Sequence, residues 1–366
     1  HISNGGYGHA VNYGIDLARG KYISIVEPDD YLEGEMLKTL YLAAEEYKLE
    51  IISSNYKHFM GSGKERIFWI EQVMGEGEFY HKVQNPFFER DLFKGTYLNQ
   101  AGLFQRDFIN KYVIRHHESP GASYQDVGFR LQTLAYCKRF MILKDAFYCH
   151  RDDNPNSSIH NRTCLDWIID EYAFVYRQME NNKDVLECFL PEFTRCKVTD
   201  YLGQYDRLVP ELRMDFLKII RKEFMDIEQK GKFITAKLTD RQRKRIQFII
   251  KEPYNYAKRE IMLREEMHNL LIKQDAFIIY GIGMFGKKIF DVMDDSDREK
   301  LRGFAVSDIC SNTKEYEGVR VRKLDAYDKD LAVIVGVTEK YEKEVILLLK
   351  DSGMQNILCI EAAKWF

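Results

Sequence analysis

Short apolar strands alternate with amphipathic helices at both ends of the chain, and this alternation is the strongest constraint on its fold. Near the N-terminus, residues 21–26 predict a buried strand and residues 50–54 predict a second one. Between them, residues 36–47 have apolar side chains at helical spacing. Strands that alternate with helices are typical of layered α/β architecture, so the sequence predicts an α/β fold.

The C-terminal part shows the same alternation of strands and helices over a shorter length. We expect helices from residue 287 onward and over 339–350. The expected strands are 276–280, 303–308, 331–337 and 356–360. We predict a small Rossmann-like α/β domain over residues 273–366.

Residues 161–272 have a helical pattern throughout, and we predict a helical connector there between an N-terminal domain over 1–160 and the C-terminal one. Basic residues outnumber acidic ones over 212–273, which also contain a stripe of apolar residues at helical spacing. A solvated helix face is the favoured interpretation, and peripheral contact with anionic lipid is the alternative.

Composition excludes several function classes. The 54 Lys and Arg residues nearly balance the 57 Asp and Glu residues, and the formal charge is −3, which argues against a globally basic nucleic-acid binder. Seven cysteines without a CxxC pair argue against a zinc ribbon or a disulfide framework. We expect reduced thiols in a cytoplasmic protein.

An acidic turn, Glu27-Pro28-Asp29-Asp30, directly follows the first predicted strand. Ligands of α/β proteins gather at the carboxyl ends of strands. Carboxylates crowded on one turn repel each other unless a cation lies between them, and oxygen donors suit Mg²⁺ or Mn²⁺. An ordinary polar turn explains Pro-Asp-Asp equally well.

The residues before this turn distinguish the two interpretations. An Asn-Gly loop at Asn4 and Gly5, a helix with a central Asn12, and the stretch 18–23 lead into the acidic turn, and this order resembles the inverting glycosyltransferases of family 2 with a GT-A fold. The resemblance implies that Asp29 and Asp30 bind a divalent metal and the diphosphate of a nucleotide-sugar. It also implies donor contacts for Asn4, Gly5, Asn12 and Glu27, where the family more often has Asp at the last position.

Two later segments extend the resemblance. Asp126 follows a Gly-Pro loop, where a helix N-cap is the ordinary role. The family places its general base at this point, which implies that Asp126 deprotonates the acceptor hydroxyl. His150 and Arg151 end a predicted strand before a polar loop that reaches residue 158, and the family's active site is closed there. The resemblance implies that they steady the leaving diphosphate, although an ordinary surface loop explains either residue nearly as well.

The family begins with a strand–helix–strand unit that holds the nucleotide base, and His1 enters the pattern after that unit. We therefore expect a partial GT-A domain in an N-terminally truncated chain.

A second glycine pattern, Gly281-Ile282-Gly283-Met284-Phe285-Gly286, lies between a predicted strand and a predicted helix. In this context glycines let a pyrophosphate approach a helix N-terminus, and Asp308 lies where a ribose-binding acid is expected. We expect either a nucleotide or nucleotide-sugar site, or a degenerate domain that positions a partner or substrate.

The leading hypothesis is a metal-dependent enzyme that transfers a sugar, with inversion, from a nucleotide-sugar to a hydroxyl of a cell-surface glycan or a lipid-linked acceptor. We expect it in the cytoplasm, or peripherally at the inner face of the membrane. The alternative is a non-catalytic nucleotide-sugar-binding or scaffold protein of polysaccharide biosynthesis. An NAD(P)-dependent oxidoreductase is weaker, because residues 273–366, which contain the C-terminal glycines, have no Tyr-x-x-x-Lys arrangement.

Overall fold

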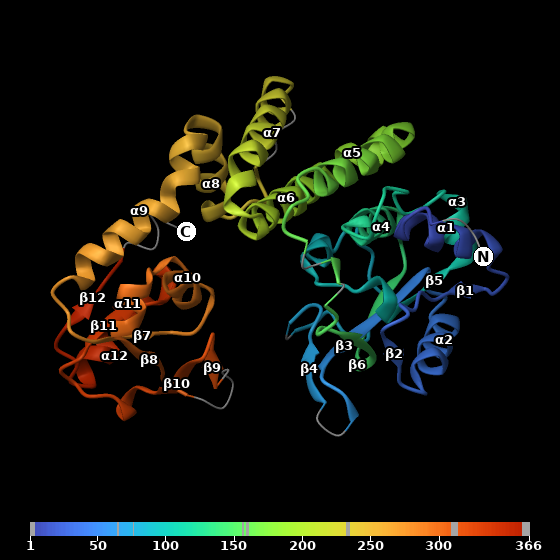
Figure 1. The fold of residues 1–366 in the computed structure, drawn as a ribbon. Coiled ribbons are helices and arrows are strands. Elements are labelled where there is room, and N and C mark those ends of the chain that lie inside the picture. The colour runs from blue at the N-terminus through green and yellow to red at the C-terminus, as the bar shows by residue number, and fades with distance from the viewer. Residues whose placement is uncertain are drawn as a thin grey trace. The chain divides into compact units, whose positions relative to one another are not determined.

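A computed structural model describes residues 4–63, 66–75, 77–155, 157–158, 161–231, 235–308 and 314–360. The chain divides into two compact units, residues 1–250 and 251–366 (Figure 1). The predicted α/β architecture is confirmed in both. Asn156 of the polar loop and Cys310 lie outside the described residues, and the six described cysteines are free.

The first unit is built on a mixed sheet with the strand order β1-β5-β3-β6-β2, and β4 pairs with β3. β3 and β6 are parallel, whereas β5, β4 and β2 each pair antiparallel with their neighbours. The strands are β1 (Tyr22–Ile23), β2 (Tyr31–Leu32), β3 (Ile51–Met60), β4 (Ile67–Glu71), β5 (Gly102–Gln105) and β6 (Phe140–Arg151).

The observed strands differ in length from the expected ones. The strand predicted over 21–26 is restricted to β1, because only Tyr22 and Ile23 pair with β5. Conversely, β3 continues to Met60 because β4 folds back along it. β2 was not predicted, since a strand of two half-buried residues has no periodic pattern.

Helices cover both faces of this sheet. Figure 1 shows α2 (Met36–Glu46) on the opposite side from α1 (Tyr7–Leu17), α3 (Arg106–Lys111) and α4 (Gln125–Tyr136). α2 forms a helix over almost all of the predicted range, and it buries the face that contains Met36, Leu40 and Ala44. The sheet to which the acidic turn is connected is therefore covered by helices on both faces.

The predicted helical region is confirmed, and its first helices pack into the first unit. These are α5 (Trp167–Met179), α6 (Lys183–Arg207), α7 (Pro210–Gln229) and α8 (Asp240–Lys251). On α7, the apolar stripe predicted from the sequence is buried at Phe216, Ile220 and Phe224 and exposed at Ile219. No helix among the described residues is long and apolar enough to cross a membrane.

The second unit starts at α9 (Pro253–Leu271) and contains a sheet with the order β12-β11-β7-β8-β10-β9. All pairs are parallel except β10 with β9. The strands are β7 (Phe277–Tyr280), β8 (Leu301–Val306), β9 (Glu315–Tyr316), β10 (Val319–Lys323), β11 (Ala332–Val335) and β12 (Ile357–Leu358).

Both faces of the second sheet are covered by helices. α9 and α10 (Met284–Val292) bury Phe277 and Ile279 on one face, with α11 (Asp295–Lys300) nearby. α12 (Glu339–Asp351) buries Ile278 and Tyr280 on the other. The chain moves outward from β7 to β8 and β10, then returns to β11 on the other side of β7, which is the doubly wound Rossmann order.

Candidate active site

The acidic turn joins β1 to β2 and is held against β6 by a buried tyrosine. The Tyr148 hydroxyl donates to Asp30 Oδ2 at 2.6 Å and accepts from the Glu27 backbone N–H at 3.2 Å. The Arg151 backbone N–H donates to Asp30 Oδ1 at 2.8 Å. Burial raises the pKa of the Asp30 carboxyl, and these hydrogen bonds oppose that rise. Asp30 therefore anchors the turn to β6.

Asp29 and Glu27 each accept a side-chain hydrogen bond at one carboxylate oxygen, whereas Asp30 accepts hydrogen bonds at both of its oxygens. Asn154 donates to Asp29 Oδ2 at 2.6 Å, and Gln100 donates to Glu27 Oε1 at 2.6 Å. In the part of the chain that the structure describes, none of the three carboxylates of the turn forms an ion pair with Lys or Arg. This cluster of hard oxygen donors fits Mg²⁺ or Mn²⁺. Asp29 has the freer carboxylate, so it is the stronger candidate ligand and Asp30 the supporting one.

Tyr7 and Gln100 connect the acidic turn to the predicted base. Gln100 Nε2 donates both to Glu27 Oε1 and to the Tyr7 hydroxyl, the latter at 3.3 Å. Burial raises the pKa of the Tyr7 phenol strongly, and the negative charges of Glu27 and Asp126 raise it further. Asn99, the neighbour of Gln100, donates to the Asp126 backbone carbonyl at 3.0 Å, so adjacent residues contact the acidic turn and the start of α4.

Asp126 is an exposed residue in the first turn of α4. The helix N-cap is Tyr124, so the ordinary role considered for Asp126 is excluded. Tyr124 has a left-handed backbone (φ 68°), and its hydroxyl donates to Gln204 on α6 at 2.6 Å. The Asp126 carboxylate accepts no hydrogen bond from another described side chain, so it is free to accept a proton.

Asn12 connects α1 to the loop that precedes Asp126. It is buried on α1, its Nδ2 donates to the His116 carbonyl at 2.9 Å and to Glu118 at 3.0 Å, and its Oδ1 accepts from the His116 N–H at 2.9 Å. Both amide atoms are engaged by the loop that precedes Asp126. Asn12 therefore positions that loop, and its contact with a donor stays a prediction.

Close backbone approaches hold α1 against the same loop. The Tyr7 N–H donates to the Gly121 carbonyl at 2.8 Å. A Cβ atom at Gly8 would lie 1.9 Å from the His117 carbonyl oxygen, so only glycine fits there. Asn4 caps the turn before the helix, because its Oδ1 accepts from the Gly6 N–H at 3.1 Å, and Gly5 is exposed beside it. The glycine-rich start therefore fits a tight helix–loop contact.

A groove lies between α1 and the strand that precedes the acidic turn. Glu27, Pro28 and Arg19 line it together with apolar side chains. Its lining residues from three segments are Asn4, Tyr7, Val11, Ile15, Ile23, Ile25 and Ala122. Glu27 and Tyr7 thus face an open, largely apolar groove.

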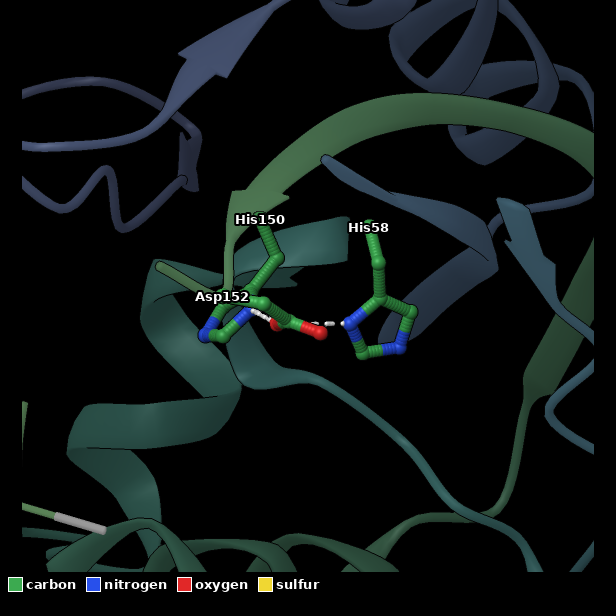
Figure 2. Close-up of side chains that lie close together, drawn as sticks. All are labelled: His58, His150 and Asp152. Atoms are coloured by element: carbon green, nitrogen blue, oxygen red, sulfur yellow. Dashed lines mark hydrogen bonds and ion pairs between the residues drawn. The ribbon is translucent and has the colours of Figure 1, made fainter. Parts of the chain in front are cut away.

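His150 and Arg151 lie at the end of β6, and their side chains pair with neighbouring acids. Arg151 Nε donates to Asp153 Oδ1 at 2.7 Å, and His150 Nδ1 lies 2.9 Å from Asp152 Oδ1. His58 Nδ1, from β3, lies 2.9 Å from the same Asp152 oxygen (Figure 2). His150 lies close enough for its charge to lower the pKa of Asp30, so the end of β6 adjoins the acidic turn.

In the second unit, the glycine pattern follows β7 at the point where the strand order reverses. Gly281 has φ 104°, and a Cβ atom at Gly286 would lie 1.9 Å from the Gly281 carbonyl oxygen. Gly283 is the N-cap of α10 and has open space where a Cβ would be. Asp308 is exposed two residues after β8. These positions fit the tight turn and close helix packing of a nucleotide-binding loop.

Four residues of the site were not found from the sequence, namely Tyr7, Gln100, Tyr148 and Asn154. Gln100 and Tyr148 contact Glu27 across 73 and 121 residues of chain, so no local pattern could reveal them. A weak signal existed for Tyr148, an aromatic residue at the end of the strand that precedes His150 and Arg151. The Tyr148 contact follows from the pairing of β2 with β6, where Tyr148 is the register partner of Leu32.

Comparison with known proteins finds similarity to one family in the first part of the chain. Residues 1–107 match the sequence profile of Glycosyl transferase family 2. The chain is 29% identical to "Uncharacterized glycosyltransferase EpsJ" of Bacillus subtilis over 164 residues, which are 43% of this chain and 45% of that protein. It is 24% identical to "Glycosyltransferase GlyG" of Streptococcus pneumoniae over 60% of this chain and 66% of that protein. The chain thus spans about half the length of the first of these relatives.

A solved structure has the same fold. The chain is similar to Staphylococcus aureus TarS 1–349 in complex with UDP-GlcNAc, with a TM-score of 0.52 and 16% sequence identity. The likeness covers 70% of this chain and 72% of that one. The predicted GT-A-like architecture is therefore confirmed.

Proposed function

We propose that this protein transfers a sugar from a nucleotide-sugar donor to a hydroxyl group of a glycan or a lipid-linked acceptor, because residues 1–107 match the profile of Glycosyl transferase family 2. The observation that most supports the proposal is that adjacent residues contact both elements, since Gln100 donates to Glu27 and Asn99 donates to the Asp126 backbone carbonyl. One carboxylate cluster can hold the diphosphate through a cation, and a second, free carboxylate can accept a proton. These are the two functions that a direct displacement needs.

Asp126 acts as the general base in this proposal. It takes the proton of the acceptor hydroxyl as that oxygen attacks the anomeric carbon, and the bond from this carbon to the diphosphate oxygen breaks. A single displacement from the face opposite the leaving group inverts the anomeric configuration. The exposed carboxylate at the start of α4 is open to an acceptor from solvent.

The acidic turn holds the leaving group. Asp29, with Asp30 and Glu27 in support, would bind Mg²⁺ or Mn²⁺, which neutralises the charge that develops on a departing diphosphate. Tyr148 keeps Asp30 oriented, and Gln100 keeps Glu27 oriented. The protein thus contributes carboxylates whose positions are fixed before the donor binds.

The donor lies in the groove between α1 and the acidic turn, with its sugar toward Asp126. UDP-GlcNAc is the first donor to test, because the structurally similar TarS was solved with that ligand. A cell-surface glycan acceptor agrees with the family. We place the enzyme in the cytoplasm at the membrane periphery, where the basic residues of 212–273 can approach anionic lipid.

A non-catalytic nucleotide-sugar-binding protein is the second candidate. The glycine loop of the second unit favours it, because Gly281 and Gly286 have the geometry of a phosphate-binding turn. In either case this loop, with Asp308, would bind a nucleotide or nucleotide-sugar.

Calorimetry and a turnover assay with the same donors distinguish the two candidates. We expect UDP-sugar binding that strengthens with Mn²⁺, together with Mn²⁺-dependent release of UDP. Asp29→Asn is expected to weaken both effects, whereas Asp107→Asn, a matched exposed carboxylate in the first turn of α3, leaves them unchanged. Binding without Mn²⁺-dependent turnover supports the non-catalytic candidate. No binding of any nucleotide-sugar contradicts both.

A further inference from the structure

We propose that His58, His150 and Asp152 form a second metal site, separate from the acidic turn, that binds a divalent transition ion such as Zn²⁺. One ligand atom from each residue lies within 4.8 Å of the other two. Figure 2 shows the Asp152 carboxylate between the two imidazole rings.

The strand register brings the two histidines together. β3 and β6 are parallel, and His58 is the direct register partner of His150. Both rings therefore project from the same face of the sheet. Asp152 follows at the end of β6, and its backbone N–H donates to the Phe59 carbonyl at 3.0 Å. The three side chains thus start from fixed backbone positions.

The rings converge on one point. His58 Nδ1 and His150 Nδ1 each lie 2.9 Å from the same oxygen, Asp152 Oδ1. Two nitrogens and one oxygen that converge in this way can bind one ion after small movements, because ligand atoms around zinc lie about 2.0–2.2 Å from the metal.

Packing fixes the orientation of His58. Its ring stacks on Trp69 of β4 with a centroid distance of 5.1 Å and an interplanar angle of 6°, and it meets the His150 ring edge-on at 5.5 Å. The His58 side chain is 18% exposed, that of His150 is 36% and that of Asp152 is 28%. The site is therefore preorganised and still open to an ion from solvent.

The local charges also favour a cation. Among the described residues, Asp152 has only the two imidazoles as partners, whereas its neighbour Asp153 pairs with Arg151. The Asp152 carboxylate is an anionic ligand whose charge a divalent ion would neutralise. The adjacent Asp153 provides a matched control for the same reason.

The donor set identifies the class of ion. Two imidazoles and one carboxylate suit Zn²⁺ and neighbouring transition ions, whereas Mg²⁺ prefers oxygen donors alone. Three protein ligands leave a fourth position for water or another ligand. The site therefore differs in selectivity from the acidic turn, which contains only oxygen donors.

Zn²⁺ titration of the full chain by calorimetry, in the absence of donor, tests the proposal. We expect a Zn²⁺ affinity that falls by more than about 100-fold in His58→Gln and in Asp152→Asn, because each removes a ligand. Asp153→Asn is expected to bind Zn²⁺ as the unmodified chain does. A Zn²⁺-dependent rise in Tm should be lost in the same two variants.

A third cluster, His268 with Asp294 and Asp297 in the second unit, provides the competing assignment. His268→Gln is expected to leave the tight Zn²⁺ site intact. The proposal is overturned if His268→Gln abolishes Zn²⁺ binding while His58→Gln does not, or if the unmodified chain binds no Zn²⁺. These outcomes are independent of sugar transfer, so the failure of this proposal and the failure of the proposed function are distinguishable.

Discussion

At the scale of single residues, the site depends on polar groups whose partners lie far along the chain. Asp29, Asp30 and Asp126 could be selected from local patterns, because each stands at a recognisable turn or helix start. Tyr148 and His58 could not, because their roles follow from the pairing of β6 with β2 and β3. The difference is physical, since a turn is encoded locally whereas a strand register is set by the whole sheet.

His116 gives a residue-scale prediction about pH. It is 1% exposed, its ring stacks on Phe129 at 4.2 Å, and burial lowers its pKa to about 3. In the unfolded chain, the His116 imidazole takes up a proton near pH 6.5, whereas in the folded chain the same imidazole stays neutral at that pH. Stability that is fully present above pH 6.5 is therefore lost as the pH falls toward 3.

Urea unfolding at pH 7.5 and pH 5 measures this effect. We expect His116 to account for about 2 kcal/mol of the stability lost between these two values, since one pKa unit corresponds to about 1.4 kcal/mol. His116→Leu should show correspondingly less pH dependence. Equal losses in the two proteins would contradict the assignment of a neutral, buried imidazole.

At the scale of elements, the helices were predicted more accurately than the strands. α2 and α12 lie within one or two residues of their expected bounds, because apolar residues at 3.6-residue spacing define a helix over its whole length. β1 is shorter than expected and β3 longer, because partner strands decide where pairing ends. The acidic turn was placed correctly because it interrupts the apolar pattern.

Two glycines of α1 give a matched element-scale prediction. Gly8→Ala should destabilise the first unit by about 1–3 kcal/mol, because its Cβ would lie 1.9 Å from the His117 carbonyl oxygen. Gly14→Ala, in the same helix with no atom within 4 Å of the new Cβ, should stabilise it by about 0.5–1 kcal/mol. Chemical denaturation measures both. Equal effects would show that α1 does not dock on the loop before Asp126.

At the scale of the whole molecule, two units with separate cores share one chain. Composition and length indicated more than one core. The return of short apolar strands that alternate with helices after the helical region indicated the second α/β sheet. The residues at which one unit ends could not be read from the sequence, because the helical pattern runs from α8 into α9 with one residue between them.

Scanning calorimetry tests the independence of the units. We expect two unfolding transitions, because each unit buries its own apolar core. Gly286→Ala, whose Cβ would lie 1.9 Å from the Gly281 carbonyl oxygen, should lower only the transition of the second unit. Gly8→Ala should lower only the other. If the chain unfolds in one transition and both variants lower its temperature equally, the two cores do not unfold independently.

In the proposed reaction, Asp126 is the base of a sugar transfer whose donor is held by the acidic turn. Asp126→Asn preserves the shape of the side chain and removes its ability to accept the proton. The decisive measurement is the Mn²⁺-dependent rate of sugar transfer to an acceptor, with the donor Kd determined in parallel. We predict a fall in kcat of about 10²–10⁴-fold with an unchanged donor Kd. Transfer at the unmodified rate by Asp126→Asn would contradict the account.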